Sequence, residues 1–294
     1  MKTPLVSLRR VSVSYDGHDA LKEVDLDIYP DDFLGIIGPN GGGKTTLVKA
    51  IVGTIPYRGT ISYSPQLFRG KERLIGYMPQ QSIFDRSFPI SVLEVVMSGL
   101  QGQRGFHARY ASGDRAKAQE LLRTAGIDGI ARKPIGEISG GQMQRALLCR
   151  AVISDPKLLI LDEPANFVDN RFENELYRML AELHGRMAIV MISHDLGTIT
   201  SVVRNIVCVN RYVHRHDSNI ITEEQLRNYD CPIQLISHGK VPHTVLALHP
   251  HDCCPHTRTE NSPAFPVSIF TDEDYDRAKA MYDERMANYG SGEK

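Results

Sequence analysis

Residues 138–145 read Ile-Ser-Gly-Gly-Gln-Met-Gln-Arg, and residues 158–164 read Leu-Leu-Ile-Leu-Asp-Glu-Pro. A third stretch, Gly-Pro-Asn-Gly-Gly-Gly-Lys-Thr at 38–45, lies far upstream. The third stretch is a P-loop, whose glycines let backbone N–H groups surround phosphate oxygens at the start of a helix. P-loops occur in many unrelated proteins, whereas a Ser-Gly-Gly-Gln turn shortly before an Asp-Glu strand end is much rarer. The combination therefore narrows the fold more than any single motif does.

Size, charge and hydropathy limit what the chain can be. With 294 residues it is long enough to bury a proper core and to form one or two domains. The formal net charge of −1 gives no basic excess that would favour nucleic acid as a partner. No apolar run approaches the roughly 18 residues of a membrane span, and the N-terminus lacks the apolar segment of a secretory signal. We therefore expect a cytosolic protein that reaches a membrane only through a partner.

Short apolar runs alternate with a helical pattern along the chain. Four nearly continuous runs suit strands of a parallel sheet that is buried on both faces, at 33–37, 158–161, 188–192 and 206–209. Between the second and third runs, apolar residues recur with a helical period, and Gly185 ends the pattern. This strand–helix–strand alternation predicts an α/β fold.

Two further segments complete the expected fold. Residues 5–15 and 24–28 alternate between apolar and polar, as half-buried antiparallel strands do. The segment 91–126 has no strand pattern but shows helical stretches, so we expect a helical insertion there. The predicted division is a P-loop domain at 1–230, with a helical subdomain at about 88–150, and a tail at 231–294.

The P-loop has the context that the motif requires, because it follows an apolar run and precedes a helix-compatible run. Lys44 is expected to reach the β- and γ-phosphates of a nucleotide, and the Thr45 hydroxyl to hold Mg²⁺. Asp162 and Glu163 end an apolar strand, where one carboxylate can ligate Mg²⁺ while the next orients or deprotonates the attacking water. The expected phosphate cradle consists of Gly38, Pro39, Asn40, Gly41, Gly42, Gly43, Lys44, Thr45 and Thr46.

Together these motifs resemble those of the ATP-binding-cassette (ABC) ATPases, and the resemblance covers residues 5–210 with the motifs in the family order. It implies a P-loop NTPase core with a parallel sheet, an antiparallel β subdomain and a helical insertion. It also implies that two copies of the chain pair and enclose two ATP molecules. Ser139, Gly140 and Gly141, with Gln142 beside them, would then contact the γ-phosphate of the ATP bound by the partner. A serine that begins a helix is also a common cap, so the residue type alone leaves this role open.

Four more residues take their roles from the resemblance alone. Gln80 matches the glutamine that contacts Mg²⁺ and the lytic water, and His194 matches the histidine that contacts the γ-phosphate. Asp169 matches an aspartate of the loop after the Asp-Glu strand, although many relatives have Ser-Ala-Leu where this chain has Asn-Phe-Val. Tyr15 matches the aromatic residue that stacks on adenine, while a tyrosine on a strand is more often a packing residue.

Finer features resemble the zinc- and manganese-type metal importers of bacteria, namely residues 99–115 and the Ile-Gly-Glu-Ile-Ser-Gly-Gly-Gln at 135–142. The resemblance implies an ATPase that energises metal uptake through an integral-membrane permease, at the cytoplasmic face of the inner membrane. An extracytoplasmic metal-binding protein would select the ion. The region around 80–94 would contact the permease, with Phe84 and Phe88 as candidates for that contact or for simple packing.

The tail is rich in histidine and cysteine, which are the side chains that Zn²⁺ prefers. This composition predicts metal affinity, and we expect the tail to sense or buffer cytosolic zinc, although the spacing matches no zinc finger. The alternative is a polar tail whose histidines are accidental or only pack. The chain's five cysteines show no disulfide-framework spacing and are expected to be thiols. The expected zinc ligands are His238, His243, His249, His251, Cys253, Cys254 and His256, and a helix is expected at 275–289.

Three other functions stay open from the sequence. The first is an ABC ATPase for another substrate, such as a siderophore or haem. The second is a non-transport ABC protein acting on ribosomes or DNA, against which the single cassette and the charge balance argue. The third is a metal store with a vestigial cassette, against which the complete set of catalytic residues argues.

Overall fold

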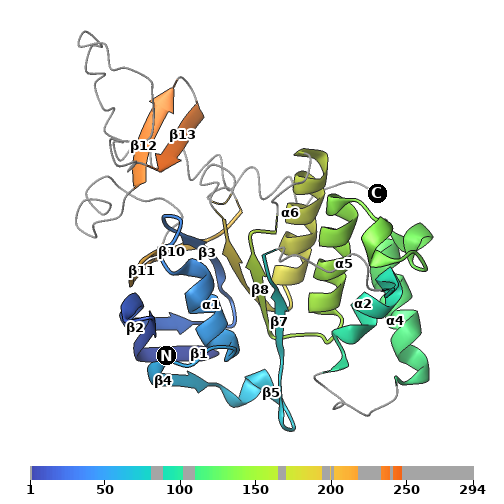
Figure 1. Cartoon of the computed structure of the whole chain (residues 1–294), viewed down its shortest axis with the longest axis horizontal. Helices are drawn as coiled ribbons and strands as arrows, with labels where there is room; N and C mark the ends of the chain where they lie inside the picture. The colour runs from blue at the N-terminus through green and yellow to red at the C-terminus, as the bar shows by residue number, and fades with distance from the viewer. Residues whose placement is uncertain are drawn as a thin grey trace.

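The computed structural model of the chain describes residues 2–80, 89–101, 110–164, 170–193, 199, 202–217, 233–238 and 241–246, with the backbone alone at 170–174 and in the last two ranges. Its centre is a six-stranded sheet (Figure 1). Three strands in the middle of this sheet coincide with predicted apolar runs. All their residues are buried, as expected for strands covered on both faces. The strand order is β11 (Tyr212–His216), β10 (Asn205–Asn210), β3 (Phe33–Ile37), β9 (Ala188–Ile192), β8 (Leu158–Asp162) and β7 (Ile75–Met78).

Strand directions confirm most of the predicted sheet. The five strands from β10 to β7 run parallel. β11 instead pairs antiparallel with β10, so the sheet is mixed and the prediction of a parallel sheet was incomplete. The sequence of β11, Tyr-Val-His-Arg-His, contains no apolar run and gave no sign of a strand. Because the other five strands are parallel, their carboxyl ends lie at one edge of the sheet.

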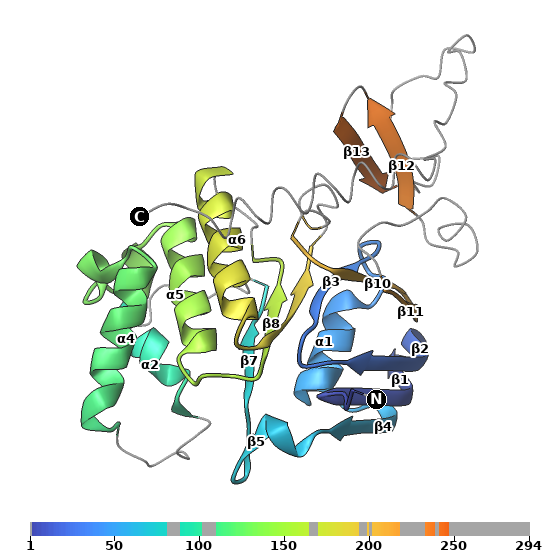
Figure 2. The same ribbon diagram turned by 180° about the vertical axis from the view of Figure 1, so that it is seen from behind.

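A second, three-stranded sheet is built from the N-terminal residues, in the order β2 (His18–Ile28), β1 (Val6–Tyr15) and β4 (Arg58–Tyr63). Both pairings are antiparallel, as the alternating pattern predicted for the first two strands. Inward-facing Leu8 and Leu26 share a hydrophobic cluster with Leu47 of helix α1 (Lys44–Val52) and Val190 of β9. This packing holds α1, and with it the end of the P-loop, between the two sheets (Figure 2). A short helical turn at Pro65–Leu67 and the small hairpin of β5 (Phe68–Arg69) and β6 (Glu72–Arg73) lead into β7.

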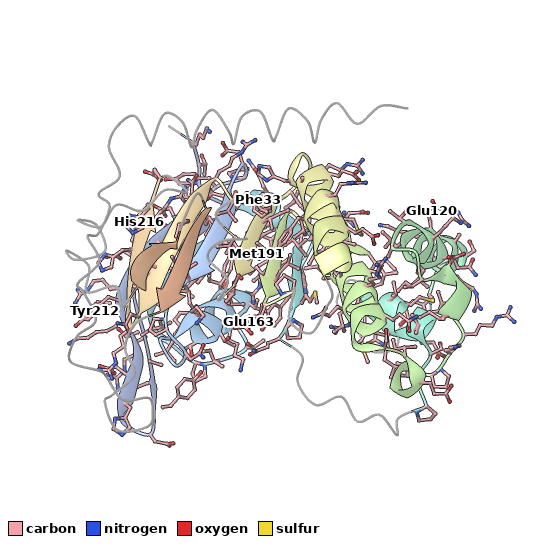
Figure 3. All side chains as sticks on the ribbon, turned by 90° about the horizontal axis from the view of Figure 1, so that it is seen from above. Phe33, Glu120, Glu163, Met191, Tyr212 and His216 are labelled. Atoms are coloured by element: carbon pink, nitrogen blue, oxygen red, sulfur yellow. The ribbon has the colours of Figure 1, made fainter. Side chains whose placement is uncertain are left out.

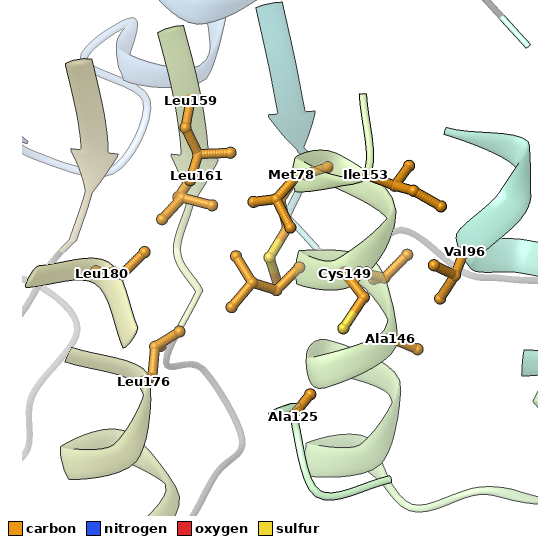
Figure 4. Close-up of a cluster of buried hydrophobic side chains, with 14 of the residues drawn as sticks. Met78, Val96, Ala125, Ala146, Cys149, Ile153, Leu159, Leu161, Leu176 and Leu180 are labelled. Atoms are coloured by element: carbon orange, nitrogen blue, oxygen red, sulfur yellow. The ribbon is translucent and has the colours of Figure 1, made fainter. Parts of the chain in front are cut away.

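Helices cover the other face of the central sheet. They are α2 (Val92–Ser98), α4 (Ser112–Thr124), α5 (Gly140–Val152) and α6 (Asn170–His184), with short 3-10 turns at Asp128–Ile130 and Ile135–Glu137. The helices α2 and α4 confirm the insertion expected at 91–126, and α6 confirms the helix expected between two apolar runs. Ala146 of α5, Leu180 of α6 and Leu161 of β8 belong to one buried cluster (Figure 4). The helices and the sheet therefore share a single apolar interior.

The tail contains regular structure that the sequence did not lead us to expect. β12 (Ile233–His238) and β13 (Val241–Leu246) form a two-stranded antiparallel sheet in which Ile236 lies opposite His243. The helix expected at 275–289 lies outside the described residues. Within the ranges that the structure describes, no helix is both long enough and apolar enough to span a bilayer.

Candidate functional site

The carboxyl ends of four neighbouring parallel strands bring the sequence motifs together. In sheet order, β3 leads into the P-loop, β9 ends next to Ser193, β8 ends at Asp162, and β7 ends two residues before Gln80. The backbone N–H of Ser193 donates to Ile36 O at 3.3 Å, which joins the ends of β9 and β3. In sheets of this kind ligands bind just outside the carboxyl ends of the strands. This edge is therefore the candidate site, and Figure 3 labels Glu163 within it.

The P-loop holds a conformation that two of its glycines make possible. Gly38 and Gly43 have φ values of +149° and +102°. A Cβ at Gly38 would lie 2.0 Å from Val209 O, and a Cβ at Gly43 would lie 2.5 Å from Ala20 O. Any side chain at either position would thus collide with backbone as well as strain φ. The glycines let the loop pass close to β10 and β2 while its N–H groups stay available at the start of α1.

Lys44 begins α1 and turns its side chain back over the loop. Its Nζ donates to Gly38 O at 2.8 Å and to Pro39 O at 2.9 Å. Burial lowers the pKa of Lys44, while the nearby carboxylates of Glu163 and Asp162 act in the opposite direction. Lys44 is 6% exposed, and its ammonium lies against the carbonyl groups of the loop. A cation fixed in this position is suited to phosphate oxygens.

Asp162 is a buried carboxylate whose surroundings suit a metal ion. It is 1% exposed, and within the described ranges neither of its oxygens has a hydrogen bond of ordinary geometry. Burial raises the pKa of Asp162, whereas the adjacent Thr45 hydroxyl lowers it in part. A buried carboxylate without hydrogen bonds is costly unless a cation compensates it. Carboxylate and hydroxyl oxygens are ligands that Mg²⁺ accepts, so the residues present fit the ion that the motifs imply.

Glu163 has a strained backbone conformation, and its side chain contacts a residue that is distant in the sequence. Its φ is +53°, which is rare for a residue with a side chain, and its N–H donates to Ile192 O at 3.1 Å. Strained backbone of this kind is concentrated at functional sites. The Gln80 amide Nε2 donates to Glu163 Oε2 at 2.6 Å. The contact joins the ends of β7 and β8, and Glu163 remains partly exposed to solvent.

Ser139 caps α5 through a reciprocal pair of hydrogen bonds. Its Oγ accepts from the Gln142 N–H at 3.3 Å, and the Gln142 Oε1 accepts from the Ser139 N–H at 3.0 Å. This capping box accounts for both side chains as elements of helix stability. Ser139 is nonetheless exposed, and Gly140 and Gly141 form the first turn beside it. No hydrogen bond in the described part of the chain joins this turn to the P-loop, so one chain alone does not link the two motifs.

The structure describes only some of the remaining predicted residues. Tyr15 is 47% exposed at the turn between β1 and β2. His194 and Asp169 lie outside the described residues, as do Phe84 and Phe88. In the tail, the backbone positions of His238 and His243 lie on β12 and β13, and the other expected zinc ligands fall outside the described ranges. The part of the chain that the structure describes contains no group of three His, Cys, Asp or Glu side chains able to hold a metal.

Two residues near the site were missed by sequence reasoning. Tyr77 lies on β7 next to β8, and burial together with the charge of Asp162 raises the pKa of its phenol to about 12. The phenol therefore stays neutral beside the carboxylate. Arg211 donates its backbone N–H to Gly42 O at 2.9 Å and so supports the P-loop from the β10–β11 turn. The position of Tyr77, three residues before Gln80, could have indicated that it lies near the site. Nothing in the sequence indicated the backbone contact of Arg211.

Comparison with known proteins identifies related chains. A family model described as ABC transporter matches residues 21–166. The zinc import ATP-binding protein ZnuC of Pseudomonas entomophila is 40% identical over 217 residues, which cover 72% of this chain and 77% of that protein. The protein of the same name from Pseudomonas putida is 39% identical with the same coverage of both chains.

Solved structures share the fold. An ABC transporter in an inward-facing conformation, assigned provisionally to the metal-chelate type, matches with a TM-score of 0.67 and 25% identity, over 82% of this chain and 96% of that one. A dimeric ATP-binding cassette in a post-hydrolysis state, bound to ADP and Pi, matches with a TM-score of 0.60 and 22% identity, over 72% of this chain and 98% of the other. The second likeness extends to the fold alone.

Proposed function

This chain belongs to the ABC transporter family, as an ATP-binding subunit, and from that premise we propose that it hydrolyses ATP to drive uptake of a divalent metal ion, zinc or manganese, through a partner permease. The observation that carries the ATPase part is the carboxylate pair Asp162–Glu163 beside the P-loop, with Gln80 bonded to Glu163. The relatives that are 39–40% identical are named for zinc import, which favours zinc over manganese.

ATP would bind with its phosphates in the loop at 38–46 and its adenine against the exposed ring of Tyr15. Lys44 would give up its bonds to the loop carbonyls in favour of phosphate oxygens. Thr45, Asp162 and Gln80 would hold Mg²⁺, which neutralises charge on the β- and γ-phosphates when it is bound. The burial of the Asp162 carboxylate, whose oxygens have no hydrogen bond of ordinary geometry within the described ranges, supports this assignment.

Hydrolysis needs a base close to the attacking water. Glu163 would accept the water proton as the water oxygen bonds to the γ-phosphorus and the bond to ADP breaks. The Gln80 amide donates to one oxygen of this carboxylate and so helps to orient the group. His194, two positions after the end of β9 in the sequence, would donate to a γ-phosphate oxygen.

The site would be completed by a second copy of the chain. Ser139, Gly140 and Gly141, with Gln142, would contact the γ-phosphate of the ATP held by the partner, and Asp169 would lie at the same junction. The exposure of Ser139 and its lack of any bond to its own P-loop support this arrangement. Each ATP would then lie between the P-loop of one copy and the α5 helix start of the other, where the helix N-terminus favours negative charge.

The proposed organisation follows from these roles. Residues 1–230 would form the ATPase domain, with the helical subdomain at about 88–150 docking on the permease near 80–94. The protein would be a peripheral subunit at the cytoplasmic face of the inner membrane. An extracytoplasmic metal-binding protein would deliver the ion to the permease, so the metal would not contact this chain during transport.

The tail at 231–294 would bind Zn²⁺ through its histidines and cysteines and reduce import when cytosolic zinc is high. Its content of histidine and cysteine supports this proposal. A metal site in the tail would be assembled when the ion binds, because ligand residues of this kind are often ordered by the metal itself.

Growth of cells that lack the gene tests the transport function. A plasmid copy of the wild-type chain should restore growth when zinc is limiting, and the Glu163→Gln variant should not, although it folds and binds ATP. Glu23→Gln, on the exposed outer sheet, is a matched control that should restore growth fully. Rescue that appears only when iron is supplied as a siderophore or haem would contradict metal-ion uptake and favour the alternative substrates.

A further inference from the structure

The side chain of Arg145 joins three helices that are far apart in the sequence. From the second turn of α5, its Nη1 donates to Ala125 O, at the end of α4, at 2.7 Å. Its Nη2 donates to Glu175 Oε2, on α6, at 2.7 Å. We infer that the Arg145–Glu175 pair has a positioning role. It fixes the start of α5 at residues 139–142, here called the Ser139 turn, relative to the end of β8 beside Glu163. The inference rests on the proposed function and adds a role for two residues that it does not use.

The site for the guanidinium is built into the end of α4. Gly126 has a φ of +67°, and a Cβ there would lie 3.3 Å from Arg145 Nη1. A glycine at this position both ends the helix in a left-handed conformation and leaves room for the arginine. The last carbonyls of a helix lack partners within the helix and carry partial negative charge. A cation that donates to Ala125 O therefore binds the end of α4 favourably.

The chemistry requires an arginine. Its planar guanidinium presents several N–H donors in fixed directions, so one side chain can bind the Ala125 carbonyl and the Glu175 carboxylate at once. A lysine carries the same charge on a single nitrogen, which cannot reproduce this geometry. The side chains of Arg145 and Glu175 are 22% and 42% exposed, so the pair contributes little to overall stability. What it contributes is a fixed relative position of the helices.

Two other polar contacts of α5 lie within the helical insertion. Cys149 Sγ lies 3.5 Å from Leu121 O of α4, and Arg150 Nε donates to Ser98 Oγ of α2 at 3.0 Å. The hydrogen bond from Arg145 to Glu175 instead links α5 to α6. Leu176 of α6 and Cys149 of α5 belong to the same apolar cluster (Figure 4), and apolar packing is non-directional, so it does not by itself fix one helix against the other. The ion pair therefore limits how α5 can shift against α6.

Arg145 lies near the residues proposed to contact the partner's ATP, and Glu175 lies on the helix that follows the residues proposed to act on the chain's own ATP. Ser139 lies six residues before Arg145 on the same helix, and Gln142 lies one turn before it. Glu175 lies on the helix that follows Glu163 along the chain. A displacement of the pair would move the turn that meets the partner's ATP without touching the P-loop of its own chain. The expected consequence is slower turnover with nearly normal ATP binding.

Steady-state ATPase kinetics of the full chain test this role. Glu175→Gln removes one charge and keeps the shape of the side chain, and Arg145→Lys keeps the charge and removes the fork. Both should lower kcat by about tenfold while KM for ATP changes by less than about twofold. The charge reversal Arg145→Glu with Glu175→Arg restores the ion pair but not the bond to Ala125 O, and should recover part of the loss. Arg123→Gln, which removes an exposed pair within α4, is the matched control and should leave both constants unchanged.

A second readout separates positioning from simple stability. In the Glu163→Gln background, Glu175→Gln should weaken ATP-induced dimerisation while the thermal unfolding midpoint stays close to that of the parent. Unchanged kcat and unchanged dimerisation in Glu175→Gln would overturn the inference, as would a loss of kcat that is matched by an equal rise in KM. A wild-type chain that neither hydrolyses ATP nor dimerises would instead contradict the proposed function, and the inference with it.

Discussion

The Gln80 amide donates a 2.6 Å hydrogen bond to Glu163 Oε2, although the two residues are 83 positions apart in the sequence. Each lies just beyond the end of its strand, and β7 and β8 are neighbours in the sheet. The bond holds a carboxylate whose backbone is already strained at a φ of +53°. The order of the strands in the sheet, rather than any local motif, thus places the Gln80 amide within hydrogen-bond distance of Glu163, the residue proposed to activate water.

Replacing Gln80 by alanine should slow hydrolysis more than it weakens nucleotide binding. Without the amide, Glu163 loses one of the contacts that orient it, and a general base contributes about 10²–10⁴-fold to rate only when it is well placed. We expect kcat to fall by at least about tenfold, with a smaller rise in KM for ATP because Gln80 is also a proposed Mg²⁺ ligand, measured by steady-state ATPase assays. Gln66→Ala, outside this edge of the sheet, serves as the control. An unchanged kcat would show that the contact has no part in turnover.

Replacing Asp162 by asparagine should stabilise the protein when no nucleotide is present. The pKa of Asp162 is higher in the folded protein than its ordinary value of 3.8 in the unfolded chain. The free energy of unfolding therefore falls as the pH rises from 3.8 through the pKa of the folded state, and below 3.8 the carboxyl group carries no such penalty. At neutral pH the buried carboxylate therefore disfavours folding, and Asp162→Asn should raise the free energy of unfolding by about 1–3 kcal/mol. Thermal unfolding without nucleotide measures this gain.

The same variant should lose its advantage in two conditions. Lowering the pH protonates the wild-type carboxyl, so the difference in unfolding midpoint should narrow. Adding ATP and Mg²⁺ should stabilise the wild type far more than Asp162→Asn, because ligand binding to the folded state adds to its stability. A variant that is less stable than the wild type at neutral pH, or that gains equally from ATP and Mg²⁺, would contradict the role assigned to Asp162.

Replacing Ser139 by aspartate separates capping from contact with the partner's nucleotide. Aspartate is as good an N-cap as serine, so the helix and the unfolding midpoint should be preserved. Its negative charge would face the γ-phosphate held by the other copy, and dimerisation driven by ATP should be lost. Ser139→Ala is the informative comparison, since it should cost about 1 kcal/mol of stability through the lost cap. Dimerisation of Ser139→Asp at the wild-type ATP concentration would argue that Ser139 is only a cap.

Removing the tail tests its proposed response to zinc. A chain ending at Asp230 keeps the strands and helices of the candidate site and loses all seven expected zinc ligands. We expect the ATPase activity of the full chain to fall as zinc is added, and the activity of the shortened chain to stay constant. Equal zinc sensitivity of the two chains would end the proposal that the tail regulates import.

The sequence predicted the elements whose signal is local. Strands β3, β8 and β9 are apolar apart from Asp162 at the end of β8, and they were predicted within a residue of their observed bounds. β7 was not, because Ile-Gly-Tyr-Met is short and interrupted by a glycine. The strands β12 and β13 each carry apolar residues, but a proline and several polar residues hid the pattern. A strand is recognised from sequence when burial on both faces leaves it little freedom of composition.

Contacts between distant segments were beyond the sequence alone. The P-loop and the Asp-Glu pair were assigned from motifs, but the bond between Gln80 and Glu163 depends on the order β8–β7 in the sheet. Arg145 was quoted as part of a motif without a role, and its partners Ala125 and Glu175 became evident only from the packing of three helices. The proposed contacts between two copies remain predictions for the same reason, since they depend on an arrangement that a single chain does not contain.

The most direct test of the account is the mass of the Glu163→Gln variant in solution with saturating ATP and Mg²⁺. Because this variant should bind nucleotide without turning it over, the account predicts a stable dimer by light scattering after gel filtration, and a monomer when ATP is left out. A variant that binds ATP yet stays monomeric at high protein concentration would contradict the claim that each nucleotide is enclosed between the P-loop of one copy and the Ser139 turn of the other.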